Sequence, residues 1–83
     1  MAYRITYKSS VKRDLKKISK TEALRILNQL EKDLSKTPDK YPALKGEFAG
    51  LHKYRVGDYR VIFAILENDV LIIRVGHRKD VYR

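Results

Sequence analysis

Cysteine is absent from this 83-residue sequence, and proline and glycine are scarce, with two and four residues. Without thiols the chain forms neither disulfides nor thiolate zinc sites, which favours a reducing, cytoplasmic compartment. Long hydrophobic runs are also missing, because the longest, residues 61–66, is far too short to span a bilayer. The first residues lack the apolar segment of a signal peptide. We therefore expect a cytoplasmic protein that does not enter a membrane.

Acidic residues are also few: the sequence has ten Asp and Glu and nineteen Lys and Arg, which gives a formal net charge of +9. A folded domain with this balance should attract phosphate backbones, so RNA or DNA is the favoured partner and an acidic protein is the alternative. The carboxylates are scattered along the chain, whereas two-metal nucleases need them clustered. The sequence therefore predicts no metal site and no cofactor.

Hydrophobic periodicity predicts one α+β domain over residues 1–83, with the element order β-α-α-β-β-β. Apolar residues alternate at the N-terminus, recur at helical spacing in two stretches, and alternate again after a loop over residues 38–50. The expected strands are residues 3–7, 51–56, 59–66 and 70–75. Two amphipathic helices should pack on one face of a small antiparallel sheet and leave the other face partly open.

The helix boundaries follow from capping residues. Ser9 and Ser10 are expected to cap the first helix. Ser19 and Glu22 have capping-box spacing and should start the second, which ends before Pro38. Lysines and arginines cover the outer face of the first helix and continue just beyond it. This face is either simply solvated or a contact to structured RNA, and its members are Lys12, Arg13, Lys16, Lys17 and Lys20.

Cations also gather on the predicted sheet. In residues 51–56, Lys53 and Arg55 share one face about 7 Å apart, and His52 lies on the opposite, helix-covered face. Arg60 follows on the next strand, and Arg74 on the last, where a bulge at Gly76 is expected to alter the register. Cations this close repel one another, so either water solvates them at exposed positions or a polyanion binds them.

The C-terminal segment adds two residues with chemical potential. Tyr82 could stack on a base, act as a general base near cations, or simply pack. His77 could serve in acid–base catalysis or be a hydrogen-bonded structural residue. By alternation, His52 is predicted to be structural. Arg78 shares a face with Arg74 if the strand is regular.

Three blocks of this sequence form a specific pattern: Leu44-Lys45-Gly46, the block from Lys53 to Arg60, and the block from Val75 to Tyr82. With these blocks as its most specific parts, the sequence resembles the RelE toxins of toxin–antitoxin systems over nearly the whole chain. The resemblance implies a small antiparallel sheet carrying two N-terminal helices. It also implies cleavage of mRNA in the ribosomal A site, by attack of a ribose 2′-OH on the adjacent phosphate without a metal.

The resemblance assigns a role to each matching residue. Lys53 and Arg55 would orient and neutralise the scissile phosphate, and Arg60 would stabilise the phosphorane. Arg78 would help the leaving oxygen depart, and Tyr82 would stack on the RNA and is a candidate base. His77, and less so Glu47, are rival bases, because other branches of the superfamily use a histidine or glutamate.

Two other functions and a partner also follow from the resemblance. The ParE branch shares the fold but poisons DNA gyrase, and an inactive RNA- or protein-binding relative is a third possibility. A toxin must be restrained, so the partners expected are a RelB-like antitoxin with an acidic amphipathic segment, and the ribosome with its mRNA.

Overall fold

The computed structural model describes residues 2–77 of the chain, apart from the side chain of residue 47. Its elements confirm the α+β class and the order β-α-α-β-β-β. They are β1 (Arg4–Tyr7), α1 (Ser9–Lys16), α2 (Lys20–Leu34), two short 3-10 turns (Pro38–Lys40 and Gly46–Phe48), β2 (His52–Val56), β3 (Tyr59–Leu66) and β4 (Asp69–His77). The two turns occupy the predicted loop, and β4 extends beyond the predicted 70–75 at both ends.

The two helices begin differently. Ser19 caps α2 as predicted, since its hydroxyl oxygen accepts a hydrogen bond from the Glu22 backbone N–H at 3.3 Å. The predicted serine cap of α1 is wrong. That helix begins after Lys8, with no side-chain cap. The Ser10 hydroxyl instead donates to the Ile73 carbonyl oxygen of β4 at 2.6 Å, because α1 lies directly along that strand.

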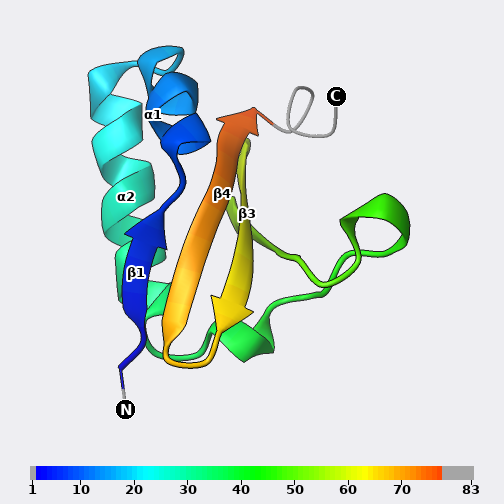
Figure 1. Cartoon of the computed structure of the whole chain (residues 1–83). Helices are drawn as coiled ribbons and strands as arrows, with labels where there is room; N and C mark the ends of the chain where they lie inside the picture. The colour runs from blue at the N-terminus through cyan, green and yellow to red at the C-terminus, as the bar shows by residue number, and fades with distance from the viewer. Residues whose placement is uncertain (1, 78–83) are drawn as a thin grey trace.

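The sheet has four strands in the order β1-β4-β3-β2 (Figure 1). Strands β2, β3 and β4 form the antiparallel meander that was predicted. The first strand differs, because β1 pairs with β4 in parallel, so the sheet is mixed. The chain reaches β2 from β1 only after both helices, and Figure 1 shows these helices together on one side of the sheet. Parallel strands need a long connection, and the chain between β1 and β4 includes both helices and the β2–β3 hairpin.

The core lies between α2 and the sheet. It includes Ile26, Leu30 and Leu34 on the helix, and Val61 and Phe63 on β3, all with side chains that are fully buried. These are the helix stripe and the apolar strand that the periodicity predicts. The region described contains no helix with the length and hydrophobicity needed to cross a membrane.

Two phenol–carboxylate hydrogen bonds tie α2 to both edges of the sheet. Tyr7 of β1 donates to Glu31, and Tyr54 of β2 donates to Asp33. Burial, reinforced by the bonded carboxylate, raises the pKa of each phenol above its usual range. Both hydroxyls therefore remain protonated donors at neutral pH. Because β1 and β2 are the two edge strands, these bonds fix the helix across the full width of the sheet.

Candidate functional site

The β2–β3 hairpin brings together Lys53, Arg55 and Arg60, which we call the cationic cluster. Arg55 and Arg60 are directly opposite each other across the two strands, and Lys53 is two residues before Arg55 on the same face. Tyr54 points the other way and is buried, as the alternation predicts. Like charges placed directly opposite destabilise a hairpin. The arrangement therefore favours a bound polyanion.

The turn between these strands sets that pairing. Val56 pairs with Tyr59, which leaves Gly57 and Asp58 as a two-residue turn. Gly57 has φ of +59°, the left-handed conformation that such hairpin turns require and that glycine adopts without strain. A different turn would shift the register, and a shift of one residue moves side chains to the other face. The turn thus places Arg55 opposite Arg60.

A pocket of about 310 Å³ lies beside the cationic cluster. Its lining combines all three cations with aromatic and ring-bearing side chains from β2 and from the segment that precedes it. The lining residues are Tyr41, Pro42, Lys53, Tyr54, Arg55 and Arg60. Such a pocket suits a ligand that carries both a negative charge and a flat apolar face.

His77 ends β4 and packs against an aromatic ring rather than facing the cationic cluster. It pairs with Tyr59, and the two rings meet edge to face with their centroids 5.9 Å apart. Tyr59 packs against the core, whereas the next residue, Arg60, belongs to the other face of β3. Gly76, not His77, is opposite Arg60. The His77 ring therefore lies on the core side of the sheet.

The other histidine has a structural role. The His52 Nδ1 donates to the Tyr41 carbonyl oxygen at 3.0 Å, and the imidazole stacks on Phe63 with ring centroids 5.4 Å apart. This agrees with the structural role predicted for it. In residues 2–77, no group of three His, Asp or Glu side chains is placed to hold a metal ion.

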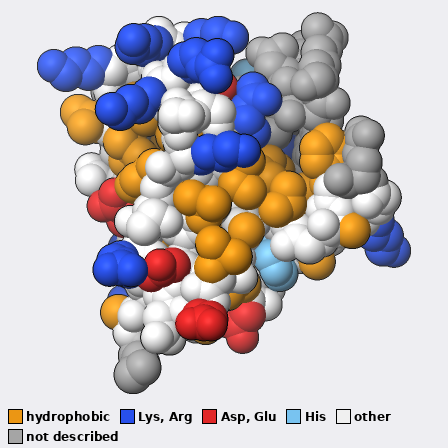
Figure 2. Space-filling view, in the orientation of Figure 1, with side chains coloured by type: hydrophobic (Ala, Val, Ile, Leu, Met, Phe, Trp, Pro, Cys, Tyr) orange, Lys and Arg blue, Asp and Glu red, His pale blue; other side chains and the backbone are white. Residues whose placement is uncertain are grey.

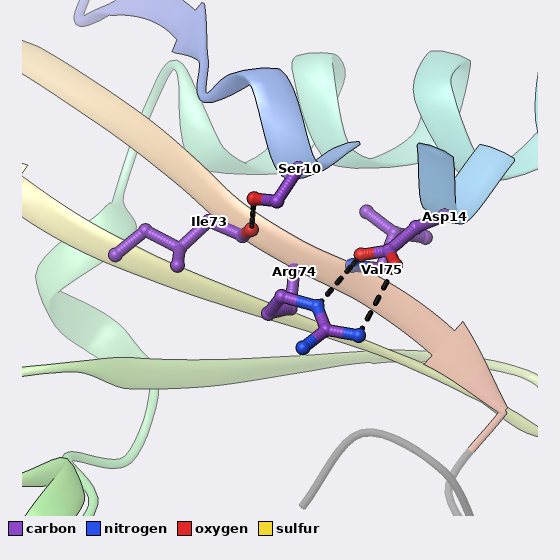
Figure 3. Close-up of polar contacts among 5 residues, drawn as sticks. All are labelled: Ser10, Asp14, Ile73, Arg74 and Val75. Carbon is purple, nitrogen blue, oxygen red and sulfur yellow. Dashed lines mark hydrogen bonds and ion pairs between the residues drawn. The ribbon is translucent and has the colours of Figure 1, made fainter. Parts of the chain in front are cut away.

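Arg74 has a specific partner, which sequence patterns did not reveal. Its guanidinium donates two hydrogen bonds to the Asp14 carboxylate, at 2.9 and 3.2 Å, and the Val75 backbone N–H donates a third at 2.9 Å (Figure 3). These contacts raise the pKa of Arg74 above its usual value, chiefly through the hydrogen bonds to Asp14. Arg74 therefore holds α1 to β4, a structural role that the sequence did not reveal, and the RNA contact expected of it stays a prediction.

The contact between Arg74 and Asp14 lies directly after a bulge in β4. Arg74 pairs with Ile62 of β3 and Ile72 pairs with Phe63, so Ile73 is the extra residue between the two pairs. The bulge expected at Gly76 is therefore located at Ile73 instead. Asp14 was missed because it is one acid among lysines. Its spacing of three from Val11 nevertheless puts it on the buried stripe of α1, and this was the available signal.

Removing the Asp14 carboxylate should destabilise the fold. Asp14→Ala leaves the Val75 N–H buried without its acceptor, so we expect the free energy of unfolding to fall by about 2 kcal/mol, measured by urea denaturation. Asp69→Ala is the matched control, because Asp69 accepts the same two-bond fork from Arg4, whose side chain is 77% exposed. The control should change stability far less. Equal losses in the two variants would contradict a special role for Asp14.

The predicted basic face of α1 is present and exposed. All five predicted cations on or just beyond this helix are exposed to solvent. Figure 2 shows Lys and Arg side chains gathered at the α1 end of the molecule, next to an apolar area over the strands. The structure thus has an exposed basic surface on α1 in addition to the cationic cluster on the hairpin. Arg78 and Tyr82 lie outside the described residues, as does the side chain of Glu47.

Comparison with known proteins gives consistent similarities at the level of sequence. A family model described as "ParE toxin of type II toxin-antitoxin system, parDE" matches residues 5–82. Toxin RelG of Mycobacterium tuberculosis is 33% identical over 86 residues, an alignment that covers 100% of this chain and 99% of that protein. Both similarities span the helices, the hairpin and the C-terminal block.

Solved structures extend the similarity to the fold. The crystal structure of the RelBE2 toxin–antitoxin complex from Mycobacterium tuberculosis contains a chain that is 30% identical, with a TM-score of 0.87. The match covers 94% of this chain and 100% of that one. The chromosomal ParDE system of P. aeruginosa contains a chain with a TM-score of 0.70 and 16% identity, covering 92% of this chain and 96% of that one. At 16% identity this second match shows the fold alone.

Proposed function

We propose that this chain is a ribosome-dependent endoribonuclease that cleaves mRNA in the A site. It belongs to the RelE/ParE superfamily of toxins from type II toxin–antitoxin systems. The observation that supports this activity is the cationic cluster, in which Arg55 and Arg60 are directly opposite beside Lys53 and share one pocket. A reaction that builds negative charge on a phosphate needs such a preorganised site.

The proposed reaction is an internal transesterification. The ribose 2′-oxygen forms a bond to the adjacent phosphorus while the bond from phosphorus to the 5′-oxygen breaks. The 2′-OH proton passes to a general base, and the departing 5′-oxygen gains a proton. The products are a 2′,3′-cyclic phosphate and a 5′-OH end. Positioning the nucleotide for in-line attack and stabilising the phosphorane supply most of the acceleration.

In the proposed reaction, each residue of the site has its own role. Lys53 and Arg55, on one strand face, bind the non-bridging phosphate oxygens, and Arg60 stabilises the charge that develops in the phosphorane. Arg78 is proposed to help the leaving oxygen depart by stabilising its negative charge, and Tyr82 is proposed to accept the 2′-OH proton. The position of His77 against Tyr59 supports the choice of Tyr82 as the base.

Two macromolecular partners complete the proposal. The exposed cations of α1 are proposed to contact ribosomal RNA, because phosphate contacts supply sequence-independent affinity. A RelB-like antitoxin is the second partner, since the chain at 30% identity was solved in a complex named RelBE2. An acidic, amphipathic antitoxin segment would complement the basic surface and the neighbouring apolar area that Figure 2 shows.

A ParE-like gyrase poison is the second candidate function. It is favoured by the description of the matching family, which names the ParE toxin. The two candidates differ in what they predict for purified protein. A gyrase poison should inhibit DNA supercoiling and leave translated mRNA intact, whereas the proposed ribonuclease should do the opposite.

Primer extension on a translated mRNA tests the proposal. Purified protein should produce new 3′ ends within codons at the A site when ribosomes are present, and few or none on naked mRNA. End-group analysis should find 2′,3′-cyclic phosphate and 5′-OH termini. Intact mRNA together with inhibited gyrase would move the protein to the ParE candidate, and 5′-phosphate products would contradict 2′-OH attack.

Cleavage should also not depend on a metal in the chemical step. The mRNA on programmed ribosomes that are stabilised with polyamine should be cleaved at about the same single-turnover rate after EDTA treatment. The reason is that the proposed step uses arginines and lysine where two-metal nucleases use ions. Sucrose-gradient analysis confirms that the ribosomes remain whole. A rate that collapses in EDTA on intact ribosomes and returns with Mg²⁺ would contradict the mechanism.

A further inference from the structure

Tyr41 and Pro42 lie along the outer edge of β2, beside the cationic cluster, and backbone hydrogen bonds fix them there. The Lys53 N–H donates to the Pro42 carbonyl oxygen at 3.1 Å, and Ala43 forms a β-bridge with His52. The short segment after the first 3-10 turn therefore runs as an extra edge beside β2. Its hydrogen bonds hold the backbone of Tyr41 and Pro42 in place relative to Lys53.

Tyr41 is held by one contact to its ring and by one to its backbone. Its ring meets the Tyr54 ring edge to face, with centroids 4.9 Å apart at 87°. The Tyr54 hydroxyl is anchored in turn, because it donates to Asp33 and lies 3.3 Å from the Gln29 carbonyl oxygen. His52 binds the Tyr41 carbonyl oxygen at 3.0 Å. Tyr41 is thus a preorganised aromatic surface with little conformational freedom to lose on binding a ligand.

The Tyr41 phenol is also neutral. Burial, and after it the negative charge of Asp33, raises the pKa of Tyr41 above its usual value. A neutral ring offers its face to a planar ligand without bringing a negative charge toward the phosphate that the cationic cluster would bind. The ring and the cluster are therefore chemically compatible with one ligand.

Tyr41 and the cationic cluster line the same pocket of about 310 Å³, with Pro42 beside them. Ligand pockets begin at about 300 Å³, so the space suits one small, flat group rather than a folded segment. Aromatic rings bind single-stranded nucleic acid by stacking on its bases, while neighbouring cations bind its phosphates. An acidic peptide would use the cations but would leave the aromatic wall without a matching planar group.

From this juxtaposition we propose that the pocket is a nucleobase subsite, in which a base next to the scissile phosphate packs against Tyr41 and Pro42. The inference rests on the proposed ribonuclease function and extends it, because it makes Tyr41 a residue that determines which nucleotides are cleaved. The phosphate on the cationic cluster fixes the backbone, and the base in the pocket fixes the position of the neighbouring nucleotide. Tyr41 then contributes to affinity and base preference rather than to proton transfer.

The test compares Tyr41→Leu with Tyr41→Phe, using programmed ribosomes and a set of mRNAs that differ in one base beside the cleavage site. Tyr41→Leu removes the aromatic face and should raise the half-saturating ribosome concentration by roughly 5- to 100-fold. It should also flatten the preference among the four bases. Tyr41→Phe keeps the ring and should behave like the unmodified protein. Thermal denaturation checks that each variant is folded.

Tyr3→Leu is the matched control, because Tyr3 is another half-buried tyrosine packed against the core but does not line this pocket. It should leave affinity and base preference unchanged. An mRNA with a 2′-deoxy substitution at the cleaved nucleotide cannot react, so its affinity for the ribosome-bound protein separates binding from cleavage. Tyr41→Leu should weaken that binding by the same factor.

The outcomes separate this inference from the proposed function. If the unmodified protein cleaves mRNA and Tyr41→Leu matches it in affinity and base preference, the subsite is wrong and the proposed function stands. If Tyr41→Leu weakens binding of an acidic antitoxin peptide and leaves RNA binding unchanged, the pocket serves a protein. If the unmodified protein neither cleaves nor binds mRNA on the ribosome, the proposed function and the subsite both fall.

Discussion

Tyr82→Phe is expected to lower the single-turnover cleavage rate by ~10²–10⁴-fold, the usual effect of losing a positioned general base. The substitution keeps the aromatic ring, so any stacking on the RNA survives while the hydroxyl that would accept the 2′-OH proton is lost. The measurement is single-turnover cleavage on saturating programmed ribosomes, which reports the chemical step rather than docking.

His77→Gln is the companion variant, since it removes the titratable nitrogen and retains hydrogen-bonding groups. We expect a mild effect, because the His77 ring packs against Tyr59 on the core side of β3 while Arg60 belongs to the other face. Near-normal rates in Tyr82→Phe together with a collapse in His77→Gln would reverse the assignment. If Tyr82 only stacks, Tyr82→Phe should be nearly silent and Tyr82→Ala severe.

The pH dependence of the rate gives an independent test of the base. A base must be deprotonated to act, so the rate should rise with pH through the pKa of that base. A histidine base gives a limb near pH ~6–7, whereas a phenol titrates higher, displaced downward by neighbouring cations. A limb near neutrality that disappears in His77→Gln would support the histidine.

Arg60→Ala is expected to reduce the saturated single-turnover rate by ~10²–10³-fold, the typical cost of removing one donor that stabilises developing charge. The position of Arg60 directly opposite Arg55 supports this expectation, because the register places both guanidinium groups by one pocket. The half-saturating ribosome concentration should change much less than the rate. The assay is the same single-turnover cleavage measured over a range of ribosome concentrations.

The double variant Lys12→Ala with Lys16→Ala is the matched control for Arg60→Ala. Both lysines are exposed on α1, one helical turn apart and separate from the hairpin pocket. The double variant should weaken ribosome association and reduce its salt dependence, because fewer counterions are released on binding. Its saturated rate should stay close to normal. Loss of the saturated rate in the helix variant, with only a binding defect in Arg60→Ala, would invert the two assignments.

Local patterns predicted the parts of this fold that depend on neighbouring residues. The spacing of Ser19 and Glu22 located the start of α2. Strict alternation placed Tyr54 in the core and, with the two-residue turn, put Lys53 and Arg55 on one face. In these cases the deciding contact is within a few residues, where periodicity and turn chemistry act directly.

The features that sequence patterns missed all depend on contacts between distant segments. Asp14 and Arg74 are sixty residues apart, and the bulge at Ile73 exists only as a mismatch between two paired strands. Likewise, nothing local distinguishes a parallel from an antiparallel partner for β1. Tyr41 was missed for the same reason. The role we propose for it depends on its contact with Tyr54 and on the pocket it shares with the cationic cluster, and only the folded chain brings these residues together.

The pairing of β1 with β4 also governs when the molecule becomes complete during synthesis. Arg4 and Asp69 are register partners separated by 65 residues, and α1 continues along the same strand as far as Val75. Of the four strands, β1 is synthesised first, but its partner β4 is synthesised last, and such non-local pairing is slow. Until β4 has been synthesised, β1 and α1 have no strand to pack against. The hairpin that carries the cationic cluster is then still bordered on one side by unpaired backbone, so this sheet can close only after β4 has been synthesised.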